Sequence, residues 1–488
     1  MIVFGDARRI WNVRDEVARI RTIRDPLTSL IEIGKLAQGV LDAGVDSAVL
    51  HVLLLAAGRG TPLHQSFWDL LTDLPEEVEV TEPEGYAFYG VHPALYAAAA
   101  RRLPRQKSWL VIGIRSIGTS LGAAVAGVLP NARLITVRPE GDPFDRVVRE
   151  RIPEAHAYAV VDEGPGLSGS SFAAVGARID SDNVWYFPSH GGDPGPRAGE
   201  ERLRWWRSRR KAFVDFDSWF DPGTLAEGAV EEWSAGRWRA HRFASAADWP
   251  AAHLQQERRK YFFPDANLVA RFAGLGVRGE ELFARTQLLA DAGFTPPPRA
   301  LRHGFLLTDA VTDAHPPADR ARLFDTVARY IAHLTRFPAT GGASPQRLAE
   351  MARVNIGAAD LEFPSHASPI AGDNRMHRWE WLATTDGRLL KTDLDHHAGH
   401  DLVGCQDPAW DLAGAIIELE ATEAEARSLV RQVEQRTGRS WPASVLRFYT
   451  TCYLAFWTGY YTMAMEVCGA DEGPRLRREV ARYRASIA

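Results

Sequence analysis

Cysteine is scarce in this sequence: 488 residues include three, Cys405, Cys452 and Cys468. None belongs to a Cys-x-x-Cys pair, so a disulfide framework and a cysteine-rich zinc site are both disfavoured. An excess of either charge is also missing, because 57 basic residues face 62 acidic ones and the formal net charge is −5. This balance provides no general attraction to nucleic acid or to an anionic membrane, so we expect neither as a partner.

Long apolar runs are rare as well. The first residues, MIVFGDARRI, carry charge early and show no apolar signal-peptide core, which predicts a cytoplasmic protein. The uncharged stretch 448–465 approaches the length of a membrane span. It is rich in Thr, Tyr and Gly and has no polybasic flank on one side, so we interpret it as a buried core helix.

The sequence does contain enough apolar residues for full cores, at 45% of its length. We expect two domains, 1–225 and 226–488, and an α/β fold class overall. Residues 1–105 have mostly helical apolar spacing, and a strand, loop, helix rhythm starts at 109, which predicts a mainly parallel sheet. The second domain alternates short strands and then turns helical, as in an α+β fold. The sequence does not identify the oligomeric state, and a homo-oligomer stays open.

The most informative stretch is Ala159–Ser171, AVVDEGPGLSGSS. Its apolar run predicts a buried parallel strand, followed by two acids and a loop that leads into a helix. Backbone N–H groups and serine hydroxyls in such a loop can bind a phosphate, while adjacent carboxylates need hydroxyl groups or a metal ion as partners. A sugar phosphate offers both. The alternatives are an ordinary strand-turn-helix corner and a serine-hydrolase elbow, but GLSGS lacks the closing glycine of G-x-S-x-G.

This stretch resembles the motif with which type I phosphoribosyltransferases bind 5-phosphoribosyl-1-pyrophosphate (PRPP). The resemblance implies that Asp162 and Glu163 are the catalytic acids and contact the ribose 2- and 3-hydroxyls. It places the 5-phosphate on a loop with the binding residues Gly166, Ser168, Gly169, Ser170 and Ser171. The family usually has threonine and paired glycines where this chain has LSGSS.

A second loop is expected at the same edge of the sheet. WLVIGI at 109–114 predicts a strand, RSIGTS a turn, and LGAAVAGVL a helix of small residues. Such a loop lies at the carboxyl end of a parallel strand, where α/β proteins bind ligands. In the family this position is the pyrophosphate loop, which implies a binding role for Arg115, Ser116, Gly118 and Thr119.

Three further segments could complete this site. The loop after ARLITV carries Arg138, Asp142 and Arg146 and corresponds to the family's mobile cover, in which the basic residues would neutralise the leaving pyrophosphate. It also fits a solvated surface loop. Residues 86–89 could belong to a hood over the acceptor. The strand in NVWYFPSHGG ends at the same edge, and its candidates for acceptor binding are Tyr186, Phe187 and His190, although a lone histidine is more often structural.

The second domain has an acid pair of its own. Asp373 and Asp393 flank two strand-like runs joined by the turn TTDG, and a tight hairpin would bring both carboxylates into one pocket. Kinase chemistry uses one Asp to orient the attacking hydroxyl and another to hold Mg²⁺ on the nucleotide phosphates. With CQDPAWDLAGAIIE downstream, 230–488 resembles the aminoglycoside phosphotransferases. The resemblance implies ATP and Mg²⁺ as ligands, Asp373 as catalytic residue, Asp393 as metal ligand, and Glu280 or Glu281 as the helix acid.

This domain departs from the family at three positions. Ala371 stands where the family has histidine, and Arg378 stands where it has a metal-binding asparagine. The third-strand lysine has no obvious occupant: Arg271 is nearest, and Lys260 lies one strand earlier. Because arginine cannot ligate a metal, either another group such as His377 serves or phosphoryl transfer has been lost.

A cluster of histidines and acids follows the acid pair. Imidazoles and carboxylates at close spacing can bind zinc or iron, but here the spacing is that of a loop. We prefer the interpretation that these side chains line the nucleotide-metal pocket. The cluster consists of Asp395, His396, His397, His400 and Asp401.

These observations lead to two hypotheses. In the first, the N-terminal domain transfers phosphoribose from PRPP to an unidentified small-molecule acceptor with Mg²⁺, and the second domain phosphorylates a small molecule with ATP. In the second, the protein is a regulator that binds PRPP and nucleotide without catalysis and contains a pseudokinase domain.

Overall fold

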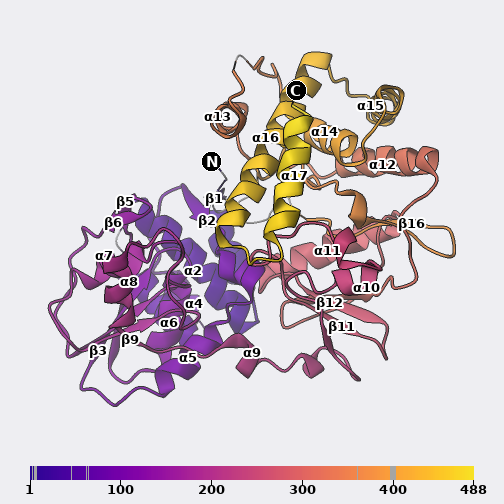
Figure 1. Cartoon of the computed structure of the whole chain (residues 1–488). Coiled ribbons are helices and arrows are strands. Elements are labelled where there is room, and N and C mark those ends of the chain that lie inside the picture. The colour runs from indigo at the N-terminus through magenta and orange to yellow at the C-terminus, as the bar shows by residue number, and fades with distance from the viewer. Residues whose placement is uncertain are drawn as a thin grey trace. The chain divides into compact units, whose positions relative to one another are not determined.

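The computed structural model describes residues 1–2, 4, 8–45, 47–61, 63, 65–359, 361–395 and 403–487 (Figure 1). The chain forms two compact units, and neither is a continuous stretch of sequence. The N-terminal unit comprises Arg8–Thr224 and Gly274–Gly279. The C-terminal unit comprises Met1–Ala7, Leu225–Ala273 and Glu280–Ala488.

A parallel five-stranded sheet forms the centre of the N-terminal unit, with the strand order β4-β3-β7-β8-β9. Strands β3 and β7 are buried throughout, as expected for parallel strands covered on both faces. The sheet elements and the helices between them are β3 (Trp109–Ile114), α6 (Gly118–Val128), β4 (Ala132–Val137), β7 (Ala157–Val161), α7 (Ser170–Gly176), β8 (Val184–Phe187), α8 (Glu200–Arg207), β9 (Arg210–Lys211) and α9 (Phe216–Trp219).

The segment before this sheet is helical except for one antiparallel pair, β1 with β2, which the helical spacing does not predict. The pair joins Arg8 to Thr81, and each strand has five residues, too few for a clear alternation of apolar and polar positions. The elements are β1 (Arg8–Asn12), α1 (Val13–Ile20), α2 (Pro26–Asp42), α3 (Ala48–Gly58), α4 (Gln65–Trp68), β2 (Glu77–Thr81), a π-helix at Gly85–Tyr89 and α5 (Pro93–Arg101).

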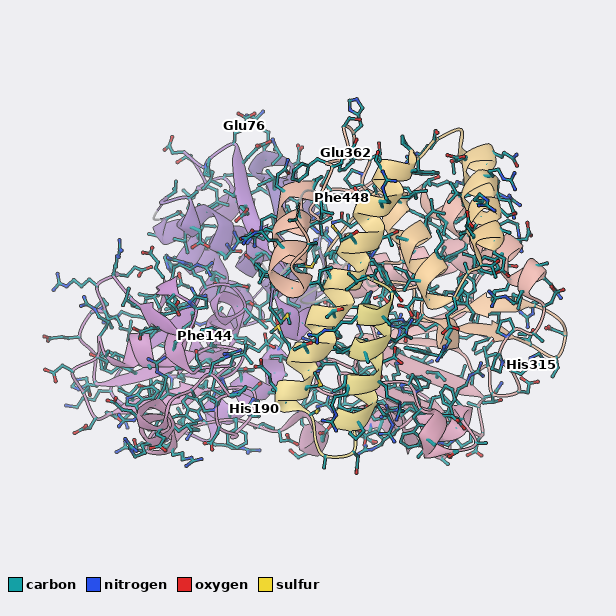
Figure 2. The ribbon with its side chains drawn as sticks, turned by 45° about the horizontal axis from the view of Figure 1, so that its top comes forward. Glu76, Phe144, His190, His315, Glu362 and Phe448 are labelled. Carbon is teal, nitrogen blue, oxygen red and sulfur yellow. The ribbon has the colours of Figure 1, made fainter. Side chains whose placement is uncertain are left out.

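A small hairpin of β5 (Glu140–Asp142) and β6 (Asp145–Val147) follows β4 and lies beside α7 (Figure 1). Phe144 lies in its turn and is 42% exposed (Figure 2). This hairpin occupies the segment for which the sequence predicts a mobile cover or a surface loop.

The C-terminal unit combines an antiparallel five-stranded sheet with a helical part. The strand order is β10-β11-β12-β14-β13, and a separate two-stranded hairpin is formed by β15 and β16. The elements are β10 (Glu231–Glu232), α10 (Arg239–Arg242), β11 (Lys260–Phe263), β12 (Leu268–Phe272), α11 (Val277–Asp291), β13 (Pro298–Arg302), β14 (Phe305–Asp309), α12 (Arg320–Leu334), α13 (Pro345–Ile356), β15 (Trp381–Ala383), β16 (Leu389–Lys391), α14 (Pro408–Glu418), α15 (Glu423–Thr437), α16 (Ala443–Val467) and α17 (Gly473–Ala485).

Helix α16 contains the uncharged stretch 448–465 and lies in the core of this unit, against α13, α14 and α17 (Figure 1). Phe448, near its start, is buried (Figure 2). The prediction of a buried core helix is therefore confirmed. Among the described helices, none combines the length and hydropathy needed to cross a membrane.

The start of the chain also belongs to the C-terminal unit. The backbone N–H of Ile2 donates to Oδ1 of Asn355 at 2.7 Å, and Nδ2 of Asn355 donates to the carbonyl of Ile2 at 3.0 Å. Asn355 is buried near the end of α13 and also donates to the carbonyl of Ala455 in α16. The first residues are thus attached to the helical core.

Candidate functional sites

The two acids of the central motif follow β7 directly, at the carboxyl end of the parallel sheet. Their backbone is held from two sides: Ser189 N–H donates to the carbonyl of Glu163 at 2.6 Å, and the Asp162 N–H donates to Phe187. The hydroxyl of Tyr96 donates to the carbonyls of both acids, at 2.9 and 3.1 Å. The carboxylates therefore project from a fixed piece of backbone.

Glu163 also connects this edge to the predicted hood. Its Oε2 accepts a hydrogen bond of 3.0 Å from the N–H of Gly85, the first residue of the π-helix. Within the π-helix, Tyr86 hydrogen-bonds through its hydroxyl to Ser120 Oγ at 2.7 Å, and both groups are buried. Burial raises the pKa of Tyr86 well above its ordinary value, so this phenol stays protonated. The residues 86–89 are thus part of the wall beside the acids.

The loop after the acids turns through two glycines in left-handed conformation, Gly166 with φ +58° and Gly169 with φ +70°. The hydroxyl of Ser168 donates to Ser170 Oγ at 3.0 Å, and Ser170 Oγ donates to the carbonyl of Pro143 at 2.8 Å. Both serines are buried, whereas Ser171 is half-buried. In this conformation the hydroxyls of Ser168 and Ser170 therefore hold the turn of the β5–β6 hairpin.

The turn between β3 and α6 packs tightly against β7. A Cβ atom on Gly118 would lie 2.5 Å from the carbonyl oxygen of Val161, closer than real Cβ contacts occur. Gly118 is therefore needed for this close approach. Thr119 is fully buried, and Ser116 is half-buried at the turn itself. Of the residues predicted for the pyrophosphate loop, Thr119 thus lies inside the unit rather than at its surface.

Arg115 is held by two carboxylates. Its Nε lies 2.9 Å from Asp42 and its Nη2 lies 2.6 Å from Glu150. Arg138 shares both partners, through its guanidinium with Asp42 and through its N–H with Glu150. Asp142 accepts from the N–H of Phe144 within the hairpin turn. The guanidinium of Arg115 is therefore engaged within the protein in this conformation, which the sequence did not predict.

The candidates for acceptor binding separate into two groups. Tyr186 and Phe187 are buried in the core, where Tyr186 packs edge-on against Phe172, so the proposal that they contact an acceptor is wrong. His190 is exposed and lies beside the motif loop: a Cβ atom on Gly164 would be 3.6 Å from its Nε2. His190 thus keeps a position next to the acids.

Arg146, a residue of the predicted cover, donates to the carbonyl of Pro139 and stays within the hairpin.

In the C-terminal unit, the predicted hairpin forms and places Asp373 and Asp393 around one side chain, Lys391 at the end of β16. The Lys391 Nζ lies 3.1 Å from Asp373 Oδ2, 2.7 Å from Glu380 Oε2 and 3.4 Å from the carbonyl of Asp393. Lys391 and Asp373 are both 0% exposed. The ammonium of Lys391 thus contacts the carboxylate of Asp373 but only the backbone carbonyl of Asp393.

The carboxylate of Asp373 has further partners. Its Oδ2 accepts from the hydroxyl of Tyr330 at 2.6 Å, and its Oδ1 accepts from the N–H of Arg375 at 3.1 Å. Burial raises the pKa of Asp373, and the charge of Lys391 opposes this rise. In this conformation the carboxylate is enclosed and cannot reach a substrate hydroxyl.

The carboxylate of Asp393 faces two positively charged side chains. Lys260 Nζ lies 3.4 Å and Arg271 Nε lies 3.7 Å from its carboxylate. Lys260 and Arg271 are opposite partners on β11 and β12, so both candidates for the family's lysine meet the same acid. Arg271 also contacts Asp395 at 2.9 Å. The assignment of Asp393 as a metal ligand stays a prediction, and in this conformation its carboxylate pairs with Lys260 and Arg271.

Helix α11 was expected to place an acidic residue at this site, but the residue that it places there is Arg285. Glu280 and Glu281 are exposed on α11. Arg285, one turn further along, is buried and donates to the carbonyls of Gly372 and Leu394 at 3.3 and 3.4 Å. Burial lowers the pKa of Arg285. The assignment of Glu280 or Glu281 as the helix acid stays a prediction, and the contacts described from this helix to the Asp373 loop come from Arg285.

Two residues considered for the missing asparagine lie elsewhere. His377 is fully buried, with Nδ1 3.1 Å from Glu418 and Nε2 3.3 Å from the hydroxyl of Tyr461. Arg378 forms a surface ion pair with Glu420. Neither lies among the oxygens around Lys391.

The Asp-Pro stretch after the site has a clear structural task. Asp407 caps α14 by accepting from the N–H of Ala409. Asp411 accepts from the backbone N–H groups of Asp373 and Asn374, at 3.0 and 2.7 Å. Burial raises the pKa of Asp411 to about 7, and the charge of Asp373 adds to this effect. This helix therefore fixes the loop that carries Asp373.

The predicted histidine cluster lies largely outside the described residues, which include Asp395 but not His396, His397, His400 or Asp401. Within the described ranges, no group of three or more His, Cys, Asp and Glu side chains could hold a metal ion.

The sequence interpretation did not single out the groups that organise this site. Lys391 had a signal, a charged residue at the end of an apolar strand just before an acid. Asp411 lies in the quoted CQDPAWDLAGAIIE stretch, but its contact with the Asp373 loop spans 38 positions and was not predicted. Tyr330 and Arg285 had no signal, because their partners are 43 and 87 positions away. Glu380 was missed although Lys391 is only 11 positions away.

The chain matches no family model and no curated protein. Among solved structures, it is similar to the choline kinase LicA from Streptococcus pneumoniae, with 14% identity over 54% of this chain and 96% of that chain, at a TM-score of 0.37. A type I macrolide 2'-phosphotransferase matches with 13% identity over 46% of this chain and 87% of that chain, at a TM-score of 0.33. The GDP complex of an aminoglycoside 2'-phosphotransferase IIIa mutant matches with 15% identity over 47% of this chain and 88% of that chain, at a TM-score of 0.32. These similarities concern the fold of about half of the chain.

Proposed function

We propose that the N-terminal unit binds PRPP and transfers its phosphoribosyl group to a small-molecule acceptor. One observation supports this most directly: Asp162 and Glu163 directly follow the buried parallel strand β7 and precede a glycine-serine loop, and the turn before α6 packs closely on the end of the same strand. Carboxylates accept hydrogen bonds from ribose hydroxyls, and the half-buried hydroxyl of Ser171 is a donor for a phosphate. The hydroxyls of Ser168 and Ser170 would have to leave the carbonyl of Pro143 to bind it.

The residues would divide the work as follows. Asp162 and Glu163 would hold the ribose hydroxyls and stabilise the positive charge that develops on the sugar ring as pyrophosphate leaves. His190, exposed beside Gly164, would contact the acceptor. The oxygen donors of the two acids fit Mg²⁺, which when bound would neutralise charge on the pyrophosphate.

Pyrophosphate release from PRPP in the presence of Mg²⁺ and pooled nucleobases tests this proposal. We expect Asp162→Asn to abolish release, because an amide cannot replace the charge of the carboxylate, and we expect Asp180→Asn, on an exposed loop, to leave it unchanged. Calorimetric titration with PRPP separates the two hypotheses, since a regulator binds PRPP without releasing pyrophosphate. Release that persists in Asp162→Asn contradicts the site.

For the C-terminal unit we propose nucleotide binding on a kinase-like fold without phosphoryl transfer. The observation that favours this over a small-molecule phosphotransferase is the complete burial of Asp373 and its pairing with Lys391 and Tyr330. A catalytic base must come within hydrogen-bond reach of the hydroxyl that it activates.

ADP formation in the presence of pooled small-molecule alcohols and amino sugars tests this second proposal. We expect no turnover above background, together with nucleotide binding that is detectable by calorimetry. ATP turnover that disappears in Asp373→Ala, and persists in the exposed hairpin-turn control Asp386→Ala, would establish the phosphotransferase instead.

A further inference from the structure

Lys391 lies inside a cage of oxygen atoms in the C-terminal unit. Besides Glu380 Oε2 at 2.7 Å and Asp373 Oδ2 at 3.1 Å, its Nζ has Asp373 Oδ1 at 3.4 Å, the carbonyl of Thr392 at 2.8 Å and the carbonyl of Asp393 at 3.4 Å. The side chain has no exposure to solvent. Five oxygens thus surround one nitrogen, although an ammonium group has three protons to donate.

These oxygens come from three parts of the chain: the loop with Asp373, the short 3-10 turn that ends at Glu380, and the residues directly after β16. Carboxylate and carbonyl oxygens that converge from separate segments are the ligands that Mg²⁺ and Ca²⁺ take in proteins. A set of this kind around a lysine is unusual, because a single carboxylate would already pair its charge.

A divalent ion does not fit this cage while Lys391 is present. The ammonium is at hydrogen-bond distances from the oxygens, whereas Mg²⁺ and Ca²⁺ need contacts of about 2.0–2.6 Å. The nearby carboxylates are also neutralised by other bases. Arg375 Nε lies 2.9 Å from Glu380, and Asp393 and Asp395 both contact Arg271.

We propose that the Lys391 ammonium is an internal cation that takes the place of a divalent metal ion between Asp373 and Glu380. Removing this amine uncovers a divalent-metal site formed by the same oxygens. The proposal does not depend on the function of the unit, because the test measures bound metal ion and not enzymatic activity.

The test uses full-length protein freed of metal with a chelator and titrated with Mn²⁺, whose bound and free forms differ in electron paramagnetic resonance. Lys391→Ala is expected to bind one Mn²⁺ per chain more than the wild type, since the truncated side chain leaves space between two carboxylates that have lost their shared ammonium partner. The double variant Lys391→Ala/Glu380→Gln is expected to lose this additional ion. Lys260→Ala, which removes a base beside Asp393 but outside the cage, is the matched control and should bind as the wild type does.

Because Lys391→Ala leaves two buried carboxylates without their shared partner, it can unfold in chelator. In that case Mn²⁺ is expected to restore the circular dichroism of the folded protein and to raise the Tm by several degrees. Lys391→Ser, which keeps a hydrogen-bond donor but leaves the space of the ammonium open, provides a second variant for the titration. A wild-type Mn²⁺ site that disappears in Glu380→Gln would overturn the proposal. So would Mn²⁺ binding by Lys391→Ala and Lys391→Ser that equals that of the wild type.

Discussion

At the scale of single residues, the buried histidine of the Asp373 loop has the clearest consequence. His377 lies between Glu418 and Tyr461, and burial lowers its pKa to about 4. In the unfolded chain it titrates near 6.5. Between these two values the unfolded state binds the additional proton, so the stability that His377 provides is present above pH 6.5 and is lost as the pH falls towards 4.

We therefore expect the contribution of His377 to the unfolding free energy to fall between about pH 6.5 and about pH 4, by at most ~1.4 kcal/mol per pH unit. His377→Gln should reduce that slope. Glu380 and Asp411 have pKa values raised to about 7 and change stability in the opposite direction, so the quantity to compare is the difference between wild type and variant in urea unfolding. Equal slopes in both proteins would show that His377 does not titrate in this way.

A second residue prediction concerns Gly118, whose Cα faces the carbonyl of Val161. Gly118→Ala places a methyl group 2.5 Å from that oxygen and should destabilise the N-terminal unit by about 1–3 kcal/mol. Gly199→Ala is the control, because its φ of −68° suits alanine and no atom lies within 4 Å of the added group. Urea unfolding measures the unfolding free energy of both variants. Equal losses in the two variants would contradict the packing argument.

At the scale of elements, the β5–β6 hairpin is attached through a serine of the motif loop. Ser170→Ala removes the 2.8 Å hydrogen bond to Pro143 and should cost about 1 kcal/mol. Amide hydrogen exchange in 140–147 should then become faster. Ser171→Ala is the adjacent control, and similar exchange in the two variants would show that the hairpin is held by other contacts.

Strands could be predicted where they are buried on both faces. The apolar runs of β3, β7 and β8 and the turn between β15 and β16 are visible in the sequence because each is a local pattern. Much of the site could not be predicted, because its partners are distant in sequence. Arg271 meets Asp395 across 124 positions, and Arg115 meets Asp42 across 73 positions (115 minus 42). The sequence shows which residues are charged, but it does not show which oppositely charged residue each of them will contact in the folded chain.

At the scale of the whole molecule, the two units have separate cores. Leu110 is fully buried in one and Leu334 in the other. We expect calorimetry to resolve two unfolding transitions. Leu110→Ala should lower the Tm of one and Leu334→Ala that of the other, because each substitution removes about 2–5 kcal/mol of unfolding free energy from its unit. PRPP should raise only the transition that Leu110→Ala lowers, because a ligand stabilises the unit that binds it. A single transition that both variants shift equally would indicate one cooperative block.

Because both units consist of separate segments of the chain, neither unit can be completed before a later segment has been synthesised. Ile2 leaves the ribosome before its hydrogen-bond partner Asn355, which emerges 353 positions later. The N-terminal unit likewise acquires its last piece, Gly274–Gly279, only after the C-terminal unit has begun to emerge. Neither half can therefore be completed by simple head-to-tail translation, and a fragment that stops at Thr224 leaves both unfinished.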